Sequence, residues 1–299
     1  MVDPVIPAIS ETLEGEVARA TAGDRGALES VVRAVQKDIY RLAIRFLWHP
    51  QDAEDATQEI LIRVITGLGS FRGDSGFRTW VYRVASNALL TLRKQRMEQQ
   101  SLSFEQFDED LAQGMSDTSW GGEDDLSQGL LLEEVKIGCT LGMLQCLDRD
   151  HRLAYILGEI MELDHREAAA ALDITPAAFR KRLSRARASI LSFMQSHCGL
   201  TNPSNACRCS RRVGTAMALG RVDPSHLLFA SSQQHAKRFP QVLAGIRQLE
   251  ESRRAAALYQ SHPEVGESGS FVAWLKHVID EMPDRLIGES VIKIRRRNE

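Results

Sequence analysis

The sequence predicts an all-α protein, in which two small helical domains are joined by an acidic linker and followed by a mainly helical C-terminal extension. Apolar residues recur at steps of three and four through much of the chain, which is the period of a helix face. The composition is 43% hydrophobic, 26% charged and only 6% aromatic, typical of a soluble, helix-rich protein. With 299 residues, the chain is long enough for two or three compact units.

Composition also excludes some classes of protein. No apolar run approaches the roughly 18 residues that span a bilayer, so we expect no membrane segment. The chain begins without a basic segment followed by an apolar stretch, and its five cysteines are an odd set. We therefore expect a reducing, cytoplasmic location.

The first helical domain is expected at residues 25–97, after an N-terminal arm at 1–24 that holds a short helix at 11–20. Apolar residues on one face predict a helix over 28–46. Asp52 is expected to cap a second helix with one acidic, polar side. A third helix is expected over 76–99.

The linker at residues 98–130 contains nine acidic residues and no basic one, and it has no sustained period, so we expect an extended segment. The second helical domain is then expected at 131–196. Its elements are an apolar-periodic segment at 131–161, a short helix at 164–172 and another at 176–196.

A helix-turn-helix is predicted within the second domain. Asp173-Ile174-Thr175 forms the turn, and Thr175 followed by Pro176 is a helix start signal. Phe179 would be buried, whereas residues 174–221 contain nine Lys or Arg and no acid. A charge run alone would favour a plain solvated helix. Together with the capped turn, the small alanines at the crossing and the absence of acids, it favours a helix that fits the DNA major groove.

A second basic run lies in the first domain. Residues 71–87 combine aromatic side chains with arginines, and a helix bearing Arg93, Lys94 and Arg96 follows. Aromatic rings beside cations suit unstacked bases and single-stranded backbone. Some of these rings must nevertheless be core, because Phe77, Trp80 and Val84 share one helix face.

Residues 52–59, 71–87 and 172–188 together resemble regions 2 and 4 of extracytoplasmic-function (ECF) sigma factors of the sigma-70 family. The resemblance implies a promoter-directing subunit that binds core RNA polymerase and promoter DNA, requires no cofactor and is not an enzyme. It implies polymerase contacts at Asp52, Glu54, Asp55, Gln58 and Glu59. It implies recognition of the minus-ten element by Arg78, Trp80, Tyr82, Arg83, Asn87, Arg93 and Lys94. It implies recognition of the minus-thirty-five element by Thr175, Arg180, Lys181, Arg182, Ser184, Arg185 and Arg187.

Two positions depart from the family pattern. Asp173 stands at a turn position that is often glycine in the family, which is tolerable because Asp enters left-handed conformations readily. Phe179 stands where a smaller aliphatic residue is usual. The acidic linker has two interpretations: a strand that threads through the polymerase, as in the family, or a solvated tether.

The extension at residues 197–299 begins with His197 and a cysteine-rich loop at 198–212. His197, Cys198, Cys207 and Cys209 together offer the number and type of ligands for zinc. Three outcomes stay open: a metal site, a redox-responsive thiol cluster, or a plain loop. Arg208, Arg211 and Arg212 would lower the pKa of these thiols. Cys139 and Cys146 are expected to be core.

Further helices are expected at 222–260 and 270–280, and a short strand or basic tail at 291–297. We hypothesise that this extension folds against the first or second domain and restricts access to polymerase, which would be self-inhibition in place of a separate anti-sigma factor. The alternative function is a one-component helix-turn-helix regulator whose extension senses a ligand or metal. No phosphate loop, nucleophile elbow or catalytic acid–base pair is recognisable, which disfavours an enzyme.

Overall fold

The computed structural model describes residues 12–92, 102–116 and 126–263. Within these ranges the chain is helical, and the only strand-like pairing is an isolated bridge between Cys198 and Cys207. The predicted all-α class is therefore confirmed. The helix expected at 270–280 and the strand or basic tail expected at 291–297 lie outside the described residues.

The N-terminal part of the described chain is a bundle of four α-helices. Asp24 caps the second helix by accepting a hydrogen bond from the Ala27 amide (3.0 Å), and the same helix ends at Trp48 in a left-handed conformation. The three expected helices are present, although residues beyond Leu92 at the end of the third are not described. The elements are α1 (Leu13–Thr21), α2 (Arg25–Leu47), α3 (Pro50–Gly67), a 3-10 turn (Leu68–Ser70) and α4 (Phe77–Thr91).

The expected cap at Asp52 is wrong. The helix α3 begins three residues earlier, with His49 as the N-cap residue and Pro50 at the first helical position. Proline suits this position because its fixed backbone angle is helical and its missing N–H would have no partner there. Asp52 therefore lies in the first turn, where a carboxylate still complements the positive end of the helix.

The linker is not simply extended, because it contains the helix α6 (Phe104–Gln113). Ser103 and Gln106 form a reciprocal capping box at its start, with hydrogen bonds of 3.2 and 3.0 Å. Phe107 and Leu111 on this helix are buried. Burial of an apolar face explains why an acidic segment folds here, and the solvated-tether interpretation fails for this part of the linker.

The second predicted domain contains the expected helices. A π-helical turn at Ile156–Ile160 continues α8, and its Gly158 lies where an added Cβ would be 3.1 Å from the ring of Phe179. Because Gly158 has no side chain, the large Phe179 ring fits against the backbone of this turn and is fully buried. The elements are α7 (Leu126–Gln145), α8 (Arg149–Tyr155), α9 (His165–Ala171) and α10 (Pro176–His197).

The extension folds into three helices within the described residues. The expectation of a loop over 198–212 is partly wrong, because α11 (Cys209–Ala218) begins inside it. The helices expected over 222–260 are α12 (Gln233–Gln248) and α13 (Glu251–Gln260). All three lie against the second domain, with α11 and α12 packing on α7 and α13 packing on α10 and on the π-helical turn.

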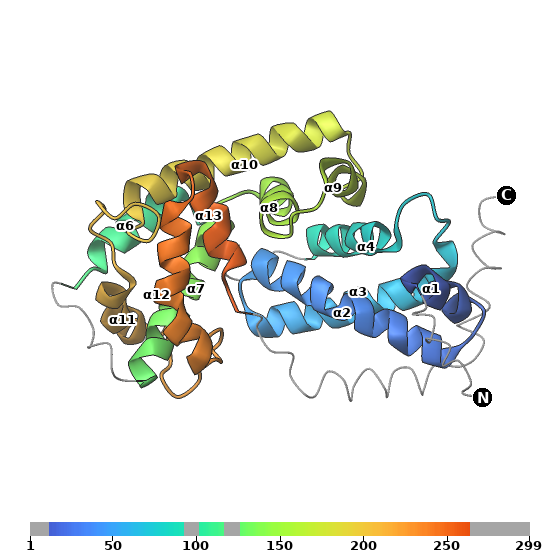
Figure 1. Cartoon of the computed structure of the whole chain (residues 1–299), viewed down its shortest axis with the longest axis horizontal. Helices are drawn as coiled ribbons and strands as arrows, with labels where there is room; N and C mark the ends of the chain where they lie inside the picture. The colour runs from blue at the N-terminus through green and yellow to red at the C-terminus, as the bar shows by residue number, and fades with distance from the viewer. Residues whose placement is uncertain (1–11, 93–101, 117–125, 264–299) are drawn as a thin grey trace, which may run out of the picture.

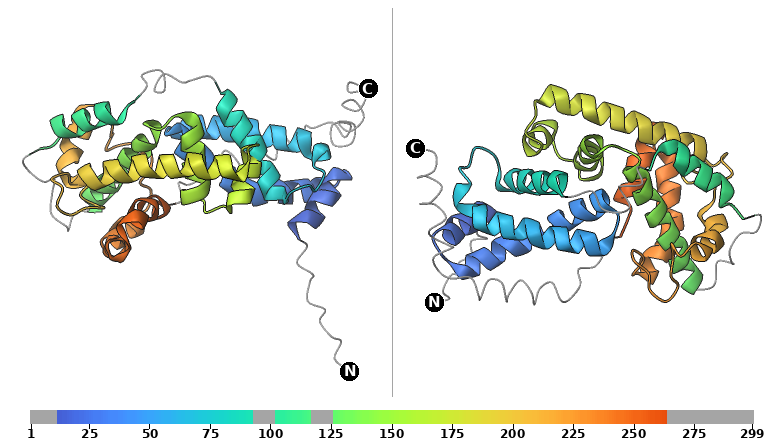
Figure 2. Two further views of the ribbon diagram at one scale, coloured as in Figure 1. Left: turned by 90° about the horizontal axis from the view of Figure 1, so that it is seen from above. Right: turned by 180° about the vertical axis from the view of Figure 1, so that it is seen from behind.

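Apart from α11, the described helices share one continuous apolar core. Figures 1 and 2 show α4 between the pair α2 and α3 on one side and α8 and α9 on the other, with α10 beyond them. Buried residues of one cluster extend from Val17 in α1 through Phe179 in α10 to Tyr259 in α13. A smaller cluster joins Val135 of α7 to Val213 of α11. Among the described helices, none has the length and apolarity to cross a membrane.

Candidate nucleic-acid interface

The predicted helix-turn-helix is formed by α9 and α10. Thr175 caps α10 by accepting a hydrogen bond from the Ala178 amide (3.2 Å), and Asp173 adopts the left-handed conformation with φ of 53°. Ala168 and Ala169 of α9 are buried at the crossing, where small side chains allow close approach of the helices. The local signals in the sequence therefore lead to the expected geometry.

The outer face of α10 is basic and accessible. Lys181, Ser184 and Arg185 are exposed and lie opposite the buried Phe179 and Leu183. In the described part of the chain, Lys181 and Arg185 form no ion pair, so both cations are free to contact DNA phosphates or guanine. Arg180 is also exposed and lies on the flank of this face.

Two of the predicted arginines on α10 are held by acids of neighbouring helices. Arg182 forms an ion pair with Asp150 of α8 (3.1 Å), and Arg187 pairs with Glu159 of the π-helical turn. These pairs orient the two arginines toward their own domain rather than along the outer face. Their predicted contacts to the minus-thirty-five element stay predictions.

The helix α4 presents fewer free side chains than its sequence suggests. Trp80 is half-buried in an aromatic cluster with Phe71 and Phe77, at ring-centroid distances of 5.7 and 5.6 Å. Arg78 pairs with Asp38 of α2. Asn87 is exposed, as a base-reading residue must be.

Tyr82 of α4 lies in the core with a relative exposure of 8%. Burial is the main cause that raises its pKa, and the nearby Asp38 carboxylate raises it further. A contact of this ring with DNA would require the bundle to rearrange. Arg93 and Lys94 lie outside the described residues.

The acidic face of α3 is accessible as expected. Asp55 is exposed, and the side chains of Asp52, Glu54, Gln58 and Glu59 are partly exposed. The sequence did not single out Ile62, a large apolar residue on this helix with 40% exposure. An exposed apolar side chain surrounded by polar ones matches the apolar centre and polar rim of protein–protein contacts. The helical period could have found it, because Ile60, Leu61, Val64 and Ile65 recur on one face and Ile62 falls outside that face.

Comparison with known proteins assigns two parts of the chain to sigma-factor regions. Residues 31–98 match the family model "Sigma-70 region 2", and residues 137–190 match "Sigma-70, region 4". The RNA polymerase sigma-H factor of Pseudomonas aeruginosa is 31% identical over 182 residues, which cover 60% of this chain and 92% of that protein. The ECF RNA polymerase sigma-E factor of Escherichia coli is 31% identical over 186 residues, which cover 61% and 95%.

The chain belongs to the ECF sigma factor family. It is therefore a sigma factor that directs RNA polymerase to promoters, and the helix-turn-helix lies within its region 4. The regulator alternative accounts for the helix-turn-helix but not for region 2. Among solved structures, CnrH in complex with the cytosolic domain of CnrY is 23% identical with a TM-score of 0.43, covering 60% of this sigma factor and 95% of that chain.

The cysteines of the sigma factor's extension are arranged differently from the expected zinc site. His197 forms an ion pair with Asp108 of α6 (2.7 Å) and stacks on Phe193, at a centroid distance of 4.5 Å. The backbones of Cys198 and Cys207 pair in the isolated β-bridge, and both thiols are free. Within the described ranges, no group of three or more His, Cys, Asp or Glu side chains is arranged to hold a metal ion. Zinc binding stays a prediction.

The thiols of the extension are less acidic than expected. Burial raises the pKa of Cys207 and Cys209, and this effect outweighs the nearby arginines that lower the pKa of Cys207. Cys139 of α7, which the sequence suggested was only core, joins this group: its pKa is raised by burial and then by the charges of Cys209, Cys198 and Cys207. Protonated thiols are weak nucleophiles and weak metal ligands.

Proposed function

We propose that this sigma factor contacts core polymerase with the acidic face of α3 and reads promoter DNA with α4 and α10, in the cytoplasm and without catalytic activity of its own. The exposed side chains support these roles. Asp55 and Ile62 lie on the accessible part of α3, Asn87 is exposed on α4, and Lys181 and Arg185 lie on the outer face of α10.

We further propose that the described form is closed and must open before a promoter can be used. The observation that carries this proposal is the direct packing of α4 against α9. Arg83 of α4 donates a hydrogen bond from Nε to the Ala170 carbonyl of α9 (2.8 Å). Arg149 of α8 donates from Nη1 to the carbonyls of Leu90 and Leu92 at the end of α4 (3.1 and 2.9 Å).

Distances on DNA make this packing incompatible with simultaneous reading of both promoter elements. The minus-ten and minus-thirty-five elements are centred about 25 base pairs apart, or roughly 85 Å at about 3.4 Å per base pair. Packed helices have axes only about 8 to 10 Å apart. Region 2 and region 4 therefore have to separate by several tens of ångströms.

The extension is placed to stabilise the closed form. Glu134 of α7 accepts hydrogen bonds from the three successive amides of Leu228, Phe229 and Ala230, at 2.8, 2.8 and 2.7 Å. The hydroxyl of Tyr259 on α13 donates to the Thr140 carbonyl of α7 (2.9 Å). These contacts hold the extension on α7 of the second domain. His262, just after α13, shares a small pocket with Tyr40 and Arg45 of α2, so the extension also reaches region 2. Both observations support self-inhibition by the extension in place of a separate anti-sigma factor.

Run-off transcription with purified core polymerase tests the closed form. Arg149→Ala removes two hydrogen bonds that cross from α8 to α4 without altering a residue assigned to DNA or polymerase. A loss of about 1 kcal/mol at this contact favours the open form, so we expect about fivefold more promoter-specific transcript at limiting sigma factor. Circular dichroism would check that the variant is folded.

The matched control for this experiment is Arg253→Ala, which removes an exposed arginine from α13. Its transcript level should equal that of the unmodified protein. If Arg149→Ala is folded and gives the same or less transcript than the control, the contact does not restrain the factor and the closed-form proposal is wrong.

A further inference from the structure

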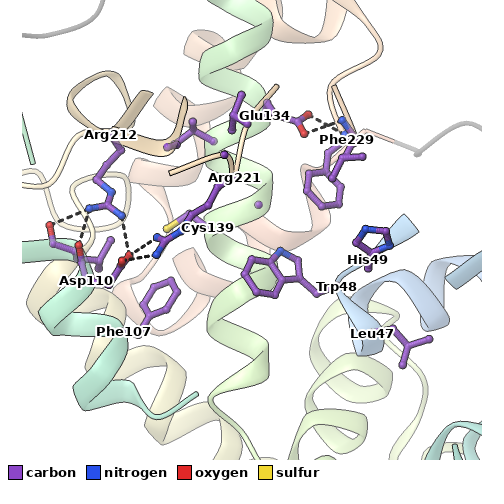
Figure 3. A pocket seen from close by; sticks show the side chains of 17 residues that line it. Leu47, Trp48, His49, Phe107, Asp110, Glu134, Cys139, Arg212, Arg221 and Phe229 are labelled. Carbon is purple, nitrogen blue, oxygen red and sulfur yellow. Dashed lines mark hydrogen bonds and ion pairs between the residues drawn. The ribbon is translucent and has the colours of Figure 1, made fainter. Parts of the chain in front are cut away.

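A cavity of about 350 Å³ lies where region 2, the linker and the extension meet. Figure 3 shows its walls, which come from the turn between α2 and α3, from α6 and α7, and from α11 and the segment that follows it. This volume is in the range of sites for small organic ligands, which is about 300 to 1,000 Å³. None of the polymerase-binding or DNA-binding surfaces described above includes this cavity.

Most of the cavity wall is apolar. The side chains that form it come from segments far apart in the sequence, and they include Trp48, Phe107, Val135, Ala216, Leu228 and Phe229. An apolar molecule that entered would therefore replace water at the surfaces of four separate parts of the chain. The free energy of such burial is about 25 cal/mol per Å².

Trp48 is held at this wall in a strained conformation. Its φ is 68°, in the left-handed region that large side chains rarely adopt. Its indole lies so close to Gly142 of α7 that an added Cβ would be 3.3 Å from the ring. Backbone strain of this kind persists where the surrounding structure requires it, often at binding sites. Here it places an aromatic ring between region 2 and α7.

One side of the cavity carries an excess of positive charge. Arg212 and Arg221 of the extension both pair with the single carboxylate of Asp110 on α6, at 2.8 and 2.7 Å. Two cations thus share one anion, and the Arg221 side chain retains 49% exposure. The other carboxylate in the wall, Glu134, is fully engaged by three backbone amides in a different part of the cavity.

We propose that this cavity binds a small, largely apolar molecule that carries one anionic group, such as an aromatic or branched aliphatic monocarboxylate. The apolar part would contact Trp48, Phe107 and Phe229, and the anionic group would pair with Arg221. A charge-assisted hydrogen bond to a guanidinium group is among the stronger polar contacts available to such a ligand.

The consequence for regulation rests on the closed form proposed above. A ligand that contacts the turn after α2 and the extension together binds only while these parts are adjacent. It would therefore favour the closed form by its difference in affinity between the two forms. The extension would then act as the sensor, and the bound molecule as a repressing signal.

Fluorescence titration with 8-anilinonaphthalene-1-sulfonate tests the site, because this probe is aromatic, carries one anionic group and emits strongly in apolar surroundings. We expect saturable binding of one probe per chain to the full-length protein. Ala216→Phe places a ring in the cavity and should weaken binding at least about tenfold. Ala218→Phe adds the same ring at an exposed position of the same helix and should leave the affinity unchanged.

The anionic requirement is tested with N-phenyl-1-naphthylamine, a neutral probe with the same rings. Arg221→Met should weaken binding of the sulfonate about tenfold and leave binding of the neutral probe within about twofold. This variant changes a half-exposed side chain, so it remains informative if Ala216→Phe fails to fold, which circular dichroism would reveal.

Equal affinities for the two phenylalanine variants, or equal effects of Arg221→Met on the two probes, would overturn the proposal. Because the titration contains neither polymerase nor DNA, such a result would leave the closed form untouched. Conversely, failure of the Arg149→Ala experiment would leave the binding site standing.

Discussion

Replacing Arg185 with alanine is expected to reduce promoter-specific transcription by about tenfold or more. Arg185 lies on the outer face of α10, and within the described chain it forms no ion pair. A guanidinium group that pairs with guanine in the major groove contributes about 1 to 3 kcal/mol to discrimination, and 1.4 kcal/mol corresponds to tenfold in binding. The measurements are run-off transcription and the affinity of the polymerase complex for DNA that contains the minus-thirty-five element.

Arg187→Ala is the matched control, because it removes the same side chain two residues later on the same helix. Arg187 pairs with Glu159, and this partner raises the pKa of the guanidinium. We expect its loss to change transcription less than about threefold. If Arg187→Ala reduces transcription as much as Arg185→Ala does, the outer face does not define the DNA contact.

Replacing Arg152 with methionine is expected to destabilise the protein by about 3 to 5 kcal/mol. Arg152 has only 3% exposure and donates hydrogen bonds to the carbonyls of Phe46, Leu144, Gln145 and Leu147 at 2.8 to 3.2 Å. Methionine fills part of the space but satisfies none of these acceptors, and each buried unsatisfied acceptor costs about 1 to 3 kcal/mol. The bond to Phe46 also joins α8 to the end of α2.

Urea denaturation followed by circular dichroism measures this effect, with Arg253→Met as the exposed control. The control should unfold at the same urea concentration as the unmodified protein. A change of less than about 1 kcal/mol for Arg152→Met would show that the four bonds contribute little beyond what water provides to the unfolded chain.

Local signals in the sequence predicted the helix-turn-helix well. Thr175 and Pro176 determine the start of α10, and Asp173 supplies the turn, so that this geometry depends on neighbouring residues. The linker was harder to predict because its charge dominates the pattern. Ser103 and Gln106 are a capping signature that the sequence does contain. The apolar face of α6 has only two buried residues, Phe107 and Leu111, which is too few to show a helical period.

Features that depend on distant contacts could not be predicted. Cys139 joins the cysteines of the extension only because α11 packs on α7. The ion pairs of Asp110 with Arg212 and Arg221 connect residues about a hundred positions apart. Through them, one acidic residue of the linker binds two arginines of the extension. No local period or spacing carries this information.

The closed arrangement is tested most directly by a distance between α4 and α10. Genetically encoded labels at Thr91 and Ser189, which are exposed on these helices, would avoid the native cysteines. We predict one short distance in the free protein, and a distance longer by several tens of ångströms in the complex with core polymerase and promoter DNA. A free protein that already shows the long distance, or an active promoter complex that keeps the short one, would contradict the closed form.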